Sequence, residues 1–87
     1  MASKPKPTTL VVIPLGAWPP NERGSACKDE HGLWWVSCPG CGLVSVASKH
    51  TITEHADGTV SFSPSLLCPK PGCGTHYFIE RNRIRYV

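Results

Sequence analysis

Two cysteine-bearing stretches decide how this chain can fold: Cys38-Pro-Gly-Cys-Gly42 and Cys68-Pro-Lys-Pro-Gly-Cys-Gly-Thr-His76. In the first stretch, two thiolates two residues apart can face one ion only if the chain turns sharply between them. Pro39 presets φ for such a turn, and Gly40 and Gly42 allow a tight backbone path. The second stretch could then complete a tetrahedral site of the kind that Zn²⁺ prefers. The sequence therefore predicts a zinc site.

The spacing leaves the fourth ligand of this zinc site open. Cys38, Cys41 and Cys73 are common to both possible sets. Adding Cys68 gives four cysteines, with four residues between the members of the second pair, whereas adding His76 gives a Cys-x-x-His pair as tight as the first. Either set would be a closed, structural site, because no coordination position remains for water or substrate.

Size and cysteine count favour metal over disulfides. A chain of 87 residues buries too little surface for a wide stability margin, so a metal would supply what the core lacks. The five cysteines are an odd number, and the longest apolar stretch, Leu10-Val-Val-Ile13, stops at Pro14. Neither a signal peptide nor a membrane span is predicted. We therefore expect a reducing, cytoplasmic environment, with cysteines used as zinc ligands.

The remaining sequence indicates short strands and turns, with no helical periodicity. Asp57-Gly58 and Arg81-Asn82 are typical of tight hairpin turns, and Pro64 is expected to end the strand before it. The predicted fold is all-β: zinc-ribbon-like antiparallel hairpins in a single domain over residues 9–87. This domain includes an irregular loop over 14–32 and follows a disordered tail over 1–8. Strands are expected at 9–13, 33–37, 43–48, 50–55, 59–63, 77–80 and 83–87.

No catalytic constellation is predicted. Ser61, Ser63 and Ser65 have no His or Asp partner at a recognisable spacing, so the sequence does not suggest a Ser-His-Asp triad. His50 and His55 are expected to be surface residues on opposite faces of a strand. The sequence therefore leads to the expectation that the protein is a non-enzymatic binding module.

Two surfaces are candidates for binding a partner. Trp18 in the long loop and Trp35 in a strand could anchor a protein interface. The alternative is nucleic-acid binding through Arg81, Arg83 and Arg85, although a net charge of +3 is mild for that role. A protein partner is the leading hypothesis, and the oligomeric state is left open.

The motifs also resemble a known family. Trp35-Val-Ser-Cys-Pro-Gly-Cys-Gly42, Pro64-Ser65 and Gly72-Cys-Gly-Thr-His-Tyr-Phe-Ile79 are similar to an uncharacterised family of small bacterial and bacteriophage zinc-ribbon-like proteins. The resemblance covers about residues 32–87. It implies a Cys-x-x-His half-site on Cys73 and His76, which favours His76 over Cys68 as the fourth ligand. It implies no activity, but suggests a small phage or prophage accessory protein that docks on a host protein in the host cytoplasm.

Overall fold

All the regular structure found is β, as predicted. The computed structural model describes residues 6–14, 20 and 22–87, and no helix is present in these ranges. None of these residues therefore forms a helix that could cross a membrane. The strands are β1 (Val11–Ile13), β2 (Ser25–Lys28), β3 (Trp34–Ser37), β4 (Val44–Val46), β5 (Thr51–Glu54), β6 (Val60–Leu67), β7 (His76–Glu80) and β8 (Arg83–Tyr86).

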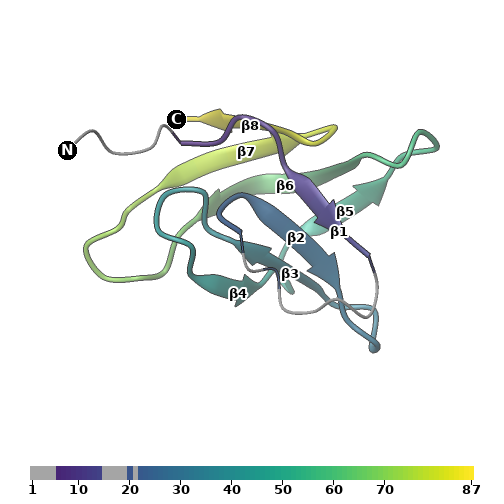
Figure 1. Cartoon of the computed structure of the whole chain (residues 1–87), viewed down its shortest axis with the longest axis horizontal. Helices are drawn as coiled ribbons and strands as arrows, with labels where there is room; N and C mark the ends of the chain where they lie inside the picture. The colour runs from purple at the N-terminus through teal and green to yellow at the C-terminus, as the bar shows by residue number, and fades with distance from the viewer. Residues whose placement is uncertain (1–5, 15–19, 21) are drawn as a thin grey trace.

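The strands form two four-stranded sheets that share one core (Figure 1). One sheet has the order β1-β2-β3-β4 and the other β5-β6-β7-β8, and every described pair is antiparallel except β1 with β2. Trp34 of the first sheet meets Phe62 of the second edge to face, with ring centroids 6.0 Å apart. The buried cluster comprises Leu10, Ala26, Trp34, Val36, Ala47, Val60, Phe62, Leu66, Tyr77, Ile79 and Ile84.

Both predicted hairpins of the second sheet are confirmed. The turn between β5 and β6 contains Asp57, whose carboxylate accepts the Thr59 backbone N–H, and Gly58 with φ of 89°. The turn between β7 and β8 places Arg81 and Asn82 at φ of 48° and 63°. Two successive residues with positive φ are what a two-residue turn of type I′ requires.

The region expected to be an irregular loop, residues 14–32, contains a buried strand. β2 lies between β1 and β3, and its residues Ala26 and Cys27 are completely buried. The Cys27 thiol is 3.4 Å from the Lys28 carbonyl oxygen. Ser-Ala-Cys-Lys has no β-branched or aromatic residue, so its strand conformation comes from tertiary pairing rather than from local propensity.

β6 also runs further than predicted. Pro64 does not end the strand, which continues to Leu67. The pairing of β6 with β7 shifts register between Phe62 and Leu66, which accommodates the proline. Such a bulge redirects nearby side chains, and Ser65 lies within it.

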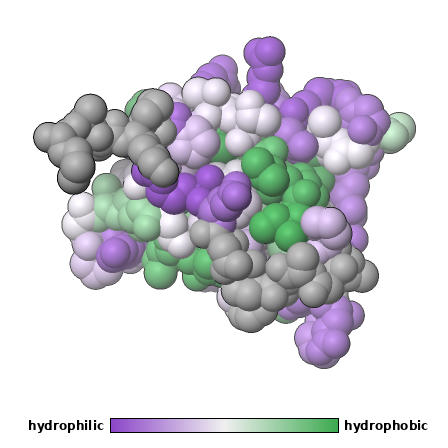
Figure 2. All heavy atoms as spheres, viewed as in Figure 1, coloured by the Kyte–Doolittle hydropathy of each residue, from purple (hydrophilic) through white to green (hydrophobic). Residues whose placement is uncertain are grey.

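The N-terminal segment packs along the sheets where it is described. The Thr8 carbonyl oxygen accepts the Ile84 N–H, and the Tyr86 hydroxyl donates to the Pro7 carbonyl oxygen. Figure 2 shows hydrophobic residues gathered over the region of β1. Val11, the first residue of β1, is 49% exposed. β1 is an edge strand of its sheet.

Candidate metal centre and catalytic site

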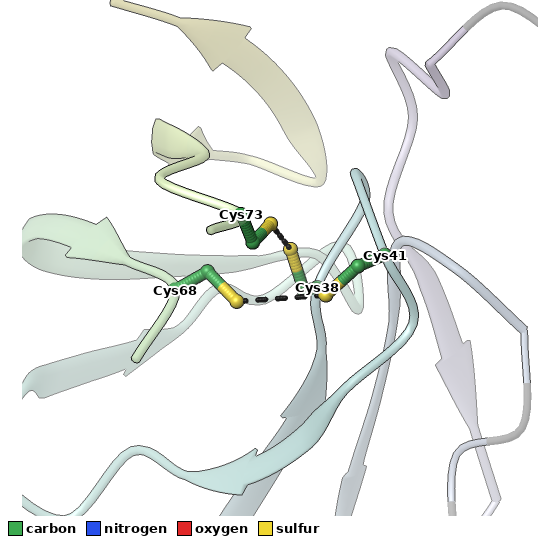
Figure 3. Close-up of side chains that lie close together, drawn as sticks. All are labelled: Cys38, Cys41, Cys68 and Cys73. Atoms are coloured by element: carbon green, nitrogen blue, oxygen red, sulfur yellow. Dashed lines mark hydrogen bonds between the residues drawn. The ribbon is translucent and has the colours of Figure 1, made fainter. Parts of the chain in front are cut away.

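Two loops, one from each sheet, bring four cysteines together (Figure 3). Cys38 directly follows β3, and Cys41 lies in the turn that leads to β4. Cys68 directly follows β6, and Cys73 lies in the loop that leads to β7. All four Sγ atoms lie within 4.8 Å of one another. The cluster therefore joins the ends of the two sheets.

The spacing of the sulfur atoms fits a tetrahedral zinc ion. Cys38 Sγ lies 3.7 Å from Cys73 Sγ, and Cys41 Sγ lies 3.6 Å from Cys68 Sγ. Zn–S bonds of about 2.3 Å in tetrahedral geometry place neighbouring sulfurs about 3.8 Å apart. A disulfide would need about 2.0 Å, so these are four free thiols. Four soft, closely grouped sulfur donors are a ligand set typical of structural zinc.

The protein environment shifts the pKa values of two of these thiols, Cys68 and Cys73, in opposite directions. Burial raises the pKa of the Cys68 thiol, because a thiolate there loses its hydration. The Thr75 hydroxyl, whose Oγ1 is 3.2 Å from Cys73 Sγ, lowers the pKa of Cys73 by hydrogen bonding to the thiolate. The Gly40 N–H also donates to Cys38 Sγ at 3.3 Å. A divalent cation would supply the charge needed to hold all four sulfurs as thiolates.

Gly40 is required by close packing at this centre. A Cβ atom on Gly40 would lie 2.2 Å from Oγ1 and 3.2 Å from Cβ of Thr75, which is itself buried. We expect Gly40→Ala to displace the Thr75 hydroxyl from Cys73 and to weaken zinc affinity by about tenfold or more, measured by chelator competition. Gly58→Ala controls for backbone strain alone, because Gly58 has φ of 89° but a Cβ there meets nothing within 4 Å, and it should keep the wild-type zinc affinity. Unchanged zinc affinity in Gly40→Ala would contradict this packing argument.

His76, the residue favoured above as fourth ligand, lies outside the four-sulfur group. It is the first residue of β7, in which Tyr77 and Ile79 point into the core. Because side chains alternate along a strand, His76 points to the opposite, outer face of its sheet. The structure therefore groups Cys68, the alternative, with the other three cysteines.

On that outer face His76 meets a serine. Its Nε2 lies 2.6 Å from Ser65 Oγ, and its ring stacks on Phe78 with centroids 6.2 Å apart and an interplanar angle of 25°. His50 contacts the backbone of the same serine, with Nε2 3.2 Å from the Ser65 carbonyl oxygen. The Nδ1 atom of His50 is buried and has no hydrogen-bond partner among the described residues. His50 is therefore half-buried rather than a simple surface residue.

A second serine–histidine contact lies on the same sheet. His55 Nε2 is 2.8 Å from Ser61 Oγ, and that oxygen also accepts the Arg81 backbone N–H at 3.0 Å. Ser61 and Ser65 both line one surface groove of about 890 Å³, together with Phe78 and Arg83. Two of the three serines that had no recognisable partner by spacing, Ser61 and Ser65, therefore have histidine partners in space.

A sequence signal for the Ser65 pair existed. Pro64-Ser65 and the Cys-x-x-His stretch are both parts of the pattern that the chain resembles, but the spacing of Cys73 and His76 is also typical of a metal half-site. Ser65 and His76 are brought together by the pairing of β6 with β7, which linear spacing does not reveal.

The described residues that were proposed for partner binding lie on both sheets. Trp18 lies outside the described residues. The Trp35 indole N–H donates to Asp29 Oδ2 at 2.8 Å on the first sheet. On the second sheet, Arg81 pairs with Asp57 at 3.7 Å, Arg85 lies 5.1 Å from the Phe78 ring centroid, and Arg83 lines the groove.

Fold and site together define a small all-β protein with a four-cysteine centre and with serine–histidine contacts on the second sheet. Over residues 17–87 the chain matches the family model described as bacterial ubiquitination-like system serine protease (BubE), and it belongs to that family. No curated protein and no solved structure matches it. The expectation of a non-enzymatic module was wrong, because the family is named for a protease. That expectation rested on the closed coordination expected for the metal and on serine spacing along the chain, whereas histidine partners are supplied by strand pairing.

Proposed function

We propose that the protein is a serine peptidase of a bacterial ubiquitination-like system, with Ser65 as nucleophile and His76 as general base. The 2.6 Å contact between Ser65 Oγ and His76 Nε2 is the observation that carries this proposal. It is the contact that a hydroxyl nucleophile needs with the base that activates it. The description of the family supports the reaction class and suggests a ubiquitin-like protein, or its conjugates, as substrate.

The two side chains account for each proton of peptide hydrolysis. With the histidine proton on Nδ1, the Ser65 hydroxyl donates to His76 Nε2 and transfers its proton there as Oγ attacks the scissile carbonyl carbon. His76 then gives this proton to the leaving amine as the C–N bond breaks, which leaves an acyl ester on Ser65. A water molecule then attacks the ester carbonyl carbon as His76 takes its proton. The C–O bond to Ser65 breaks, the acyl group leaves as a carboxylic acid, and His76 returns the proton to Ser65 Oγ.

The second pair, Ser61 with His55, is better suited to a structural role. The Ser61 oxygen accepts the backbone N–H of Arg81, which has a positive φ in the turn between β7 and β8. Its lone pair therefore stabilises that turn. Ser65 Oγ, by comparison, has the His76 ring as its hydrogen-bond partner among the described residues. We therefore assign catalysis to Ser65 and use Ser61 as its control.

The four cysteines would hold a zinc ion whose role is to fix the catalytic pair. Ser65 stands three residues before Cys68, and His76 stands three residues after Cys73. A metal bound by both cysteines would fix the adjoining ends of β6 and β7, and so the distance between nucleophile and base. With four protein ligands it would have no open position for a reacting water.

Covalent labelling tests the assignment of the nucleophile. A fluorophosphonate reacts with an activated serine hydroxyl and forms a stable phosphonyl ester, which peptide mass spectrometry can locate. We expect the adduct on Ser65 and no adduct after Ser65→Ala, whereas Ser61→Ala should be labelled at the wild-type rate. An adduct on Ser61, or no serine adduct on the folded protein, would contradict the proposal.

A further inference from the structure

The outer face of the second sheet is apolar on both sides of the catalytic pair. Ser65 and Leu67 are two residues apart on β6, and His76 and Phe78 are two residues apart on β7. Their neighbours Leu66, Tyr77 and Ile79 belong to the core, so alternation places the four side chains on the outer face. Leu67 is 63% exposed and Phe78 is 37% exposed. Large apolar side chains are thus left in solvent beside the reactive groups.

Both apolar residues are direct neighbours of His76 on the second sheet. Leu67 is the cross-strand register partner of His76, and such partners have Cβ atoms about 5 Å apart. Phe78 stacks on the same imidazole with centroids 6.2 Å apart. A single exposed leucine needs no explanation, but two exposed apolar residues that flank one histidine do.

The groove continues this surface away from the catalytic pair. Ser65, Phe78 and Arg83 all line it. A polypeptide segment bound in this groove with its scissile carbonyl at Ser65 would pass over Phe78. Leu67 does not line the groove, and the segment would meet it where it continues past His76, the register partner of Leu67.

We propose that Leu67 and Phe78 form an apolar subsite that binds the apolar side chains of the substrate segment next to the bond that is cleaved. This inference rests on the proposed function and names the substrate chemistry that the site selects. Leu67 is the residue to substitute in a test of the subsite. Phe78 is unsuitable, because it also stacks on the His76 ring and its loss would affect the base.

Two fluorophosphonates with the same reactive head test this subsite, one carrying an alkyl linker and the other a polyethylene glycol linker. On wild-type protein we expect the alkyl probe to label Ser65 about fivefold faster, since a partly exposed apolar contact gains only part of the full burial energy. Leu67→Ser should reduce this ratio at least about threefold, because the contact that favours the alkyl linker is lost. Leu33→Ser, at a leucine that is 43% exposed in the loop before β3, is the matched control and should keep the wild-type ratio.

The outcomes separate the subsite from the catalytic assignment. Equal labelling of wild-type Ser65 by the two probes, or an unchanged ratio in Leu67→Ser, would overturn the subsite and leave the nucleophile intact. Failure of both probes to label Ser65 would overturn the proposed function and the subsite with it. Zinc content and thermal melting of each variant establish that the compared proteins are folded.

Discussion

Replacement of His76 by alanine is expected to abolish the reactivity of Ser65 while the chain stays folded. His76 lies on the exposed side of β7, so its loss removes a base without opening a cavity in the core. Loss of either member of a serine–histidine pair lowers kcat/KM by about 10⁴-fold or more. We expect this loss in cleavage of a ubiquitin-like protein carrying a C-terminal extension, and an equally large fall in fluorophosphonate labelling.

His55→Ala is the matched control for this experiment. His55 makes a similar contact, 2.8 Å to Ser61 Oγ, on the same sheet and beside the same groove. Its replacement should change the rate by less than about twofold, because surface substitutions away from a site have small effects. Full activity in His76→Ala, or a large loss in His55→Ala, would show that the catalytic assignment is wrong.

Replacement of Cys68 by serine is expected to remove the metal and unfold the protein. The cysteine cluster joins a loop of each sheet, and structural zinc contributes about 10–16 kcal/mol in small zinc domains at neutral pH. This is as large as the whole stability of a typical domain, about 5–15 kcal/mol. We expect Cys68→Ser to lose zinc in elemental analysis, to lose its cooperative thermal transition and to lose Ser65 labelling. A strong chelator should have the same effect on the wild-type protein.

The fifth cysteine provides the control for this prediction. Cys27 is fully buried in β2, and no described contact places it near the cluster. Cys27→Ser should therefore retain the wild-type zinc content.

Acidification should release the metal, because burial raises the pKa of Cys68 and protons then compete strongly with zinc for this sulfur. A folded Cys68→Ser variant with undiminished zinc would contradict the four-cysteine site.

Local chemistry made much of the fold predictable. Three turns are encoded within a few residues each, by Cys38-Pro-Gly-Cys-Gly42, Asp57-Gly58 and Arg81-Asn82. The turn between Cys38 and Cys41 and both hairpins of the second sheet could therefore be placed. β2 could not be placed, because its small residues become a strand only through burial between β1 and β3. The path of β6 past Pro64 likewise depends on a register shift against β7.

The site was harder to predict because metal spacing and strand alternation give conflicting indications for His76. The Cys73-Gly-Thr-His76 spacing suits a zinc ligand, whereas the alternation with Tyr77 and Ile79 directs the imidazole to the outer face. Ser65 reaches this histidine only through cross-strand register. The nucleophile and its base are thus properties of the folded sheet.

The zinc content of purified His76→Ala tests the central claim, which is that Cys68 serves the metal and His76 serves the chemistry. Inductively coupled plasma mass spectrometry on the folded variant should find one zinc ion per chain, the same as in the wild-type protein. Loss of zinc from His76→Ala would make the histidine a metal ligand and remove it from the proposed catalytic pair.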